Sequence, residues 1–86
     1  SFNNIPNAVF HHVIRVFHRA AGPLLLGQVS LEIGWSIERT EQVVQQLIEK
    51  GILREAEGAE RAYLGLSVDA NLFALVGPAS VQLARW

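Results

Sequence analysis

The chain has 86 residues, of which 50% are hydrophobic and 17% are charged, so it is long and apolar enough for one small packed domain. This composition excludes a disordered tail, and the absence of cysteine excludes disulfides, thiolate zinc sites and cysteine nucleophiles. The formal net charge of −1 argues against the strong attraction to phosphate on which many stand-alone DNA-binding domains rely.

The first predicted element is a helix from Ala8 to about Ala21, with Asn7 as its N-cap. Gly22 and Pro23 break this helix, and the apolar run at 24–26 suits a short strand. Hydrophobic residues recur along the helix at a spacing that predicts a wide buried stripe, made of Val9, Phe10, Val13, Ile14, Phe17 and Ala21.

Residues 27–33 fit two kinds of structure. Val29, Leu31 and Ile33 alternate with polar residues, which indicates a strand. The spacing of Val29 and Ile33 also fits a helix. We expect a short helix, because the segment that follows needs one in front of it, and the strand is the alternative.

The next segment carries the strongest local signals in the chain. Gly34 suits a backbone that leaves a helix with positive φ, and Ser36 is a good N-cap for a new helix. Lys50 followed by Gly51 is the usual pattern at a helix C-terminus. These signals predict a helix over 37–50 whose inward residues are Thr40, Val44, Leu47 and Ile48.

Beyond this helix we expect two strands, at 52–56 and 62–66, joined by a compact turn at 57–60 that contains a glycine. Ser67 is then a candidate N-cap for a further helix that ends at Gly77. The apolar side of that helix is predicted to hold Leu72, Phe73, Leu75 and Val76.

The order of short helix, tight turn, second helix and β-hairpin resembles the winged helix-turn-helix family, in which the hairpin is the wing. The junction at 47–53, Leu-Ile-Glu-Lys-Gly-Ile-Leu, looks like the family's passage from second helix to wing. The resemblance implies an α+β fold, mainly α, with about four helices and a small antiparallel sheet of two or three strands, in which the run at 24–26 pairs with the wing. The residues that stand where the family keeps its core are Val29, Ile33, Trp35, Thr40, Val44 and Leu47.

We expect residues 1–86 to form a single winged-helix domain with its core at about 7–76. The segment 77–86 is mostly apolar and either packs on the core or forms a subunit interface, as in a homodimer. No apolar run reaches the roughly 18 residues of a spanning helix, and the first residues lack the features of a signal peptide. The expectation is a cytoplasmic protein that does not contact a membrane.

The resemblance implies binding to double-stranded DNA, as in a transcriptional regulator or a DNA-associated complex. The reader would be the helix at 37–50, because the first turns of such a helix meet base edges in the major groove. Arginine can pair with guanine and glutamine with adenine, while arginines on the wing can hold phosphate. The predicted nucleic-acid-binding residues are Arg39, Gln42, Gln45, Gln46, Arg54 and Arg61.

Acidic residues on the same elements support an alternative. Glu38 and Glu41 lie on the leading turns of the reader helix, and the wing carries Glu55, Glu57 and Glu60. Carboxylates beside phosphates are mostly repelled. The alternative function is a winged helix that acts as a protein–protein interaction module in a larger assembly, without DNA binding.

Other surface features carry less specific signals. His11, Arg15 and His18 share one face of the first helix, which is either a phosphate patch or a plain solvated surface. His11 and His18 are two turns apart, about 10 Å along the axis, so we expect no metal site. The sequence has no glycine-framed serine elbow and no phosphate-cradling glycine loop, so neither an enzyme nor a cofactor is expected.

Overall fold

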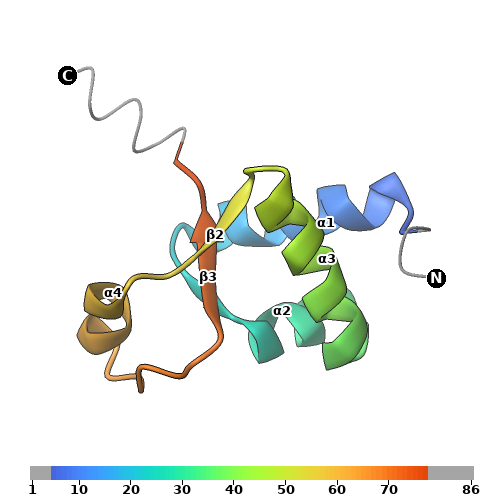
Figure 1. Cartoon of the computed structure of the whole chain (residues 1–86). Helices are drawn as coiled ribbons and strands as arrows, with labels where there is room; N and C mark the ends of the chain where they lie inside the picture. The colour runs from blue at the N-terminus through green and yellow to red at the C-terminus, as the bar shows by residue number, and fades with distance from the viewer. Residues whose placement is uncertain (1–4, 78–86) are drawn as a thin grey trace.

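The computed structural model describes residues 5–77. Within that range the chain forms four helices and one three-stranded sheet. The elements in chain order are α1 (Asn7–Ala20), β1 (Leu24–Leu25), α2 (Leu26–Ile33), α3 (Ile37–Glu49), β2 (Leu53–Glu55), α4 (Gly58–Tyr63) and β3 (Leu72–Leu75). Helices α1 to α3 pack together, the sheet lies beside them, and α4 stands at the far end of the domain (Figure 1). This mainly helical α+β layout is the one expected and is compatible with a winged helix.

The first helix lies where it was predicted, but both of its ends differ in detail. It begins at Asn7, and the N-cap position is held by Pro6, so the prediction of Asn7 as the cap was wrong. Ala21 is exposed and adopts a left-handed conformation with φ 56°, so it ends the helix and is not part of the buried stripe. Val16, which was not predicted to be buried, is part of the buried stripe of α1 and is only 5% exposed.

Residues 26–33 form a helix, as expected, and the burial pattern shows why the strand alternative fails. Leu31 is 85% exposed, whereas an alternating strand would bury it on the same face as Val29. Val29 is fully buried, and the next residue, Ser30, is buried too. Two consecutive buried residues followed by an exposed leucine fit the period of a helix.

The core lies where the first three helices meet the sheet. Phe17 from α1, Leu47 from α3 and Leu53 from β2 are each 1% exposed. The buried residues of this cluster are Phe10, Val13, Phe17, Leu26, Val29, Val43, Val44, Leu47, Leu53 and Phe73. Thr40 is also buried, and Ile33 and Trp35 are partly buried against the cluster, so all six core residues named from the resemblance pack inward.

The sheet has the order β1-β3-β2, and both pairings are antiparallel. Leu24 lies opposite Phe73 and Arg54 opposite Ala74. The short first strand therefore pairs with the wing, as the resemblance implied. The central strand is β3, which is the last described strand in the sequence.

The second half of the wing was predicted wrongly. Residues 62–66 are not a strand, because α4 occupies Gly58–Tyr63, and the helix expected after Ser67 is replaced by β3 at Leu72–Leu75. Three consecutive residues of β3 are buried, since the strand is central and covered on both faces. Such a run has no alternation that would distinguish it from a buried helix. The two expected roles of the segment 77–86 concern residues that lie almost entirely outside the described part of the chain.

Candidate nucleic-acid interface

The turn that aims α3 is held by one glycine and two serines. Gly34 ends α2 with φ 75°, the left-handed conformation that favours glycine. The hydroxyl of Ser30 donates a hydrogen bond of 2.6 Å to the carbonyl oxygen of Trp35. The Ser36 hydroxyl accepts a bond of 3.2 Å from the Arg39 backbone N–H, so Ser36 is the N-cap of α3, as predicted. These bonds fix the direction in which α3 leaves the turn.

The outer face of α3 is acidic. Glu38, Glu41 and Glu49 lie along it, and Lys50 is the cation at its C-terminal end. The Lys50 ammonium lies 4.8 Å from the centre of the Phe10 ring, so it is drawn toward α1. The residues that line the shallow hollow on this face are Glu38, Glu41, Gln42, Gln45, Gln46, Glu49 and Lys50.

The four predicted reader residues share α3 but differ in exposure. Gln45 is exposed, while Gln42 and Gln46 are half-buried. The guanidinium of Arg39 lies 4.2 Å from the centre of the Trp35 ring, so this cation stacks on the turn that precedes its own helix. The structure therefore brings the glutamines together and sets the single arginine of α3 against the turn.

Arg54 of the wing is engaged inside the domain. Its Nη1 and Nη2 donate to the two carboxylate oxygens of Glu60 at 2.7 and 2.9 Å. The Glu60 carboxylate also accepts a hydrogen bond of 2.8 Å from the backbone N–H of Glu57, the N-cap residue of α4. The bond from Arg54 has the largest effect on the Glu60 carboxylate, and together these bonds lower the pKa of Glu60 to about 2. The same pairing raises the pKa of Arg54.

Arg61 is engaged as well. Its Nε donates to the carbonyl oxygen of Ala70 at 2.9 Å, and its Nη1 donates to the carbonyl oxygen of Ala56. One side chain thus ties together the two ends of the connection between β2 and β3. No local pattern predicts these two bonds, because they form only when 58–63 is helical and places Arg61 between Ala56 and Ala70.

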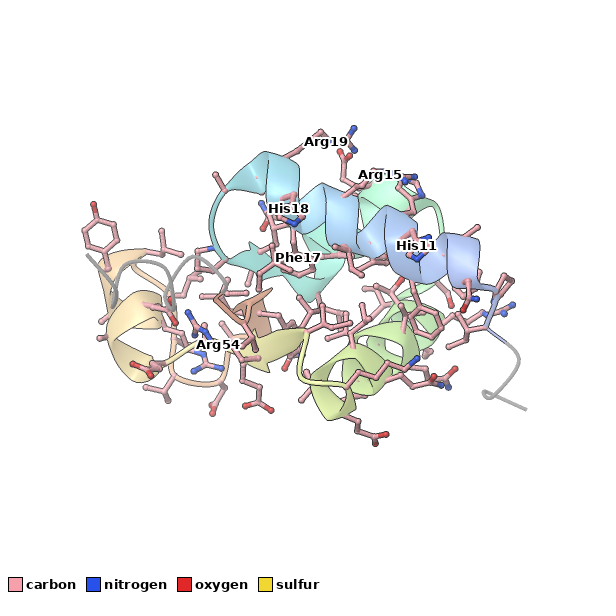
Figure 2. The ribbon with its side chains drawn as sticks, turned by 90° about the horizontal axis from the view of Figure 1, so that it is seen from above. His11, Arg15, Phe17, His18, Arg19 and Arg54 are labelled. Atoms are coloured by element: carbon pink, nitrogen blue, oxygen red, sulfur yellow. The ribbon has the colours of Figure 1, made fainter. Side chains whose placement is uncertain are left out.

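The basic residues of α1 lie apart from the acidic face of α3. The helix holds no aspartate or glutamate, and His11, Arg15 and His18 are exposed on it (Figure 2). The buried stripes of α1 and α3 meet in one core cluster, so their outer faces point in different directions. The structure therefore does not join the α1 cations to the predicted readers in one continuous basic surface.

Three exposed apolar side chains lie close together in the sequence at the end of α4 and just beyond it, a feature that was not predicted. Tyr63 is 90% exposed, Leu64 48% and Val68 80%. No residue of α4 is buried, so this connection is held by the polar bonds of Arg54 and Arg61 and not by apolar packing. This feature was not predicted because Tyr63 and Leu64 were expected in a strand at 62–66, and Val68 in a helix that begins after Ser67.

Among residues 5–77, no three His, Asp or Glu side chains come together in a group suited to a metal ion. Across the same residues no helix has both the length and the apolar character needed to span a bilayer.

No family model, curated protein or solved structure matches this chain.

Proposed function

We propose that this domain is a winged helix that acts as a protein-interaction module. The observation that carries the proposal is the character of α3, whose outer face presents Glu38, Glu41 and Glu49 where a DNA reader needs a surface that tolerates phosphate. A chain without cysteine suits the reducing cytoplasm, where we place this activity.

Electrostatics disfavours a duplex at this surface. Protein–DNA affinity depends on cations that neutralise phosphates, and like charges brought within a few ångströms repel each other. Both wing arginines already hold partners within the domain. Arg54 would have to leave the Glu60 carboxylate before it bound a phosphate, and that carboxylate would then lie beside the same phosphate.

The connection between β2 and β3 supports a protein partner. Tyrosine is enriched at protein–protein interfaces, where its ring supplies contact area at a small cost in conformational entropy. Tyr63 is 90% exposed on a short helix that two arginines hold in place. A rigid support for exposed apolar groups is what an interface needs, because less ordering is required on binding.

Duplex binding is the second candidate. It is favoured by the Ser36-capped turn into α3 and by the exposed Arg39 and Gln45 near the start and middle of that helix. In this case the reading contact would come from Arg39, which would exchange Trp35 for a base edge.

A titration separates the two candidates. A labelled mixed-sequence duplex is titrated with the domain at low and at moderate salt, for the wild type and for Arg39→Glu. We expect no saturable binding of the wild type at either salt concentration. Saturable binding that weakens steeply with salt and is lost in Arg39→Glu would replace the proposal with DNA recognition.

Selection from a random peptide display library tests the proposal directly. The immobilised, folded domain should enrich a set of related peptides, and a synthetic copy of one should bind saturably and shift the amide resonances of one contiguous surface. The urea-unfolded domain is the control. Enrichment no greater than on that control would contradict the interaction function.

A further inference from the structure

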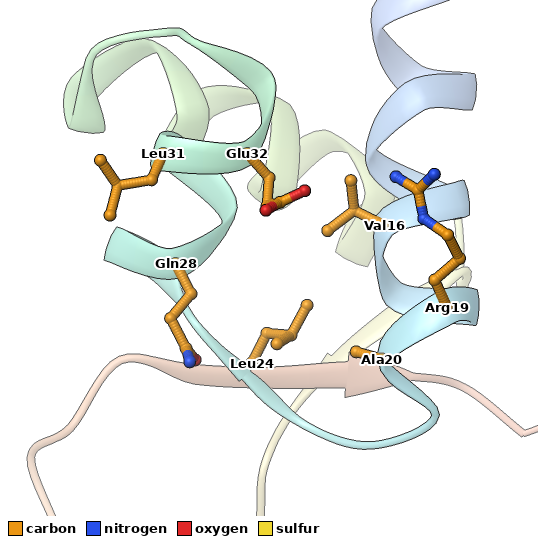
Figure 3. Close-up of a pocket in the computed structure, with 7 residues that line it drawn as sticks. All are labelled: Val16, Arg19, Ala20, Leu24, Gln28, Leu31 and Glu32. Atoms are coloured by element: carbon orange, nitrogen blue, oxygen red, sulfur yellow. The ribbon is translucent and has the colours of Figure 1, made fainter.

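A hollow of about 400 Å³ lies between α1, α2 and β1 (Figure 3). Val16 and Ala20 reach it from α1, and Leu24 reaches it from β1. Leu31 on α2 lies at its edge and is 85% exposed, so a large apolar side chain stands in solvent beside an apolar hollow. The volume falls within the range of pockets that bind small ligands and is enough for one aliphatic or aromatic side chain.

Charged and polar groups border this hollow. Arg19 on α1 and Glu32 on α2 lie on facing walls, and no salt bridge in residues 5–77 joins them (Figure 3). Gln28 accepts the Leu25 backbone N–H through its Oε1 at 2.8 Å, which leaves its amide NH₂ as a donor at this edge. The wall formed by α1 is thus cationic, and α2 contributes a single carboxylate.

The cationic wall continues along α1. Arg15 lies one turn before Arg19, and both point to the outer side of the helix, away from α3 (Figure 2). Neither arginine takes part in a salt bridge with any of the residues that the structure describes. The absence of acidic residues from α1 leaves this side without a counter-charge on the same helix. Apolar space beside unpaired cations is complementary to a ligand that carries both apolar and acidic groups.

We propose that the hollow between α1 and α2 binds a short acidic amphipathic segment of a partner protein. One large apolar side chain of the segment fills the hollow against Leu31 and Val16, and flanking carboxylates pair with Arg15 and Arg19. This inference rests on the proposed function, since it names the surface and the partner chemistry of a protein-interaction module. A nucleic-acid backbone satisfies only half of the site, because phosphates make no use of the apolar hollow.

The test measures the binding of three labelled peptides of equal length by fluorescence anisotropy. The first alternates acidic residues with leucine and phenylalanine, the second replaces its acidic residues with lysine, and the third replaces its apolar residues with serine. We expect saturable binding of the first peptide alone. Loss of either the acidic or the apolar residues should weaken binding by about tenfold or more, because both sets of contacts contribute.

Matched variants assign the binding surface. Arg19→Glu and Leu31→Ser should each weaken binding of the first peptide by about tenfold, since each removes a central contact. Arg39→Glu makes the same change of charge on α3, and Ile37→Ser removes an exposed branched aliphatic side chain at the start of that helix; both controls should change affinity less than about twofold. Leu31 and Ile37 are 85% and 52% exposed, so neither substitution removes core packing.

Several outcomes would overturn the inference, and they separate it from the function beneath it. Equal losses in Arg19→Glu and Arg39→Glu would indicate unspecific charge attraction. If library peptides bind saturably but shift the amide resonances of α3 or Tyr63, the hollow is not the binding site, while the interaction function is still supported. Binding of the duplex and of no peptide would remove both. Light scattering that shows a dimer, abolished by Leu31→Ser, would assign the hollow to a second copy of the chain.

Discussion

The helical half of the domain and its wing are stabilised in different ways. Helices α1 to α3 share an apolar core in which Val13, Val29 and Val44 are completely inaccessible to solvent. The connection from β2 to β3 contains α4, which buries no residue and is fastened by the guanidinium groups of Arg54 and Arg61. Apolar packing is worth several kcal/mol per large side chain, whereas partly exposed polar bonds are worth about 1 kcal/mol each. The wing connection should therefore open locally well before the helices unfold.

The largest effect is expected in the shared core. Leu47→Ala should lower the free energy of unfolding by about 2–5 kcal/mol, because Leu47 is 1% exposed and its loss leaves a cavity. Urea denaturation followed by circular dichroism measures the change. Leu31→Ala is the matched control and should stay within about 0.5 kcal/mol of the wild type. Similar losses for both variants would mean that the core is not where the structure places it.

A second change tests a polar side chain that is buried deep among the helices. The Thr40 hydroxyl is buried and has no hydrogen-bond partner in the described part of the chain. Thr40→Val keeps the shape and removes this hydroxyl, so the domain should gain about 1 kcal/mol of stability. Thr40→Ser, which keeps the hydroxyl and loses a methyl group, should lose about as much. Destabilisation by the valine variant would contradict this, since it would show that the hydroxyl is bonded in solution.

The third change acts on the wing. Arg61→Met keeps the length of the side chain but removes its bonds to the Ala56 and Ala70 carbonyl oxygens, at a cost of about 1 kcal/mol. Amide hydrogen exchange should become faster across 58–71 and stay unchanged in α3. Arg15→Met is the control for the loss of charge. If exchange rose equally in α3, the wing and the helices would form one cooperative unit and the contrast between them would not hold.

The smallest effect is a dependence on pH in the wing. The pKa of Glu60 is lowered to about 2 from 4.5 by Arg54, so the folded state favours the carboxylate. Its contribution is complete above about pH 4.5 and is lost as the pH falls through about 2, and partial exposure keeps it below about 1 kcal/mol. Glu60→Gln should therefore be less stable than the wild type at pH 6, and the difference should vanish near pH 2.

Glu41→Gln is the matched control for this pH series. Glu41 is exposed on α3 and takes part in no salt bridge with the residues that the structure describes. Its stability difference from the wild type should stay small and nearly constant as the pH falls. A gap between Glu60→Gln and the wild type that persists at pH 2 would show that the carboxylate charge is not the stabilising feature.

The end of α2 and both ends of α3 could be predicted because their signals are local, whereas the predicted cap of α1 was wrong. The Ser36 cap is settled by one hydrogen bond between residues three apart, and the turns at Gly34 and Gly51 by the φ angles of 75° and 76° that glycine permits. The candidate reader face was also predictable, since residues on one side of a helix follow from spacing alone. The internal partners of Arg54 and Arg61 were not, because they depend on where α4 and Ala70 lie.

The amino-acid sequence by itself determined helices α1 and α3, the turn between α2 and α3 and the short strand that follows Pro23, whereas the pattern within α2 fitted a strand as well as a helix. Only the tertiary structure decided that Leu72–Leu75 is the central strand and that 58–63 is a helix. The physical reason is that β3 gains its hydrogen bonds from β1 and β2, which are distant in sequence, and is buried without alternation. Local propensity does not contain that information, because pairing across the sheet forms only when the whole chain is folded.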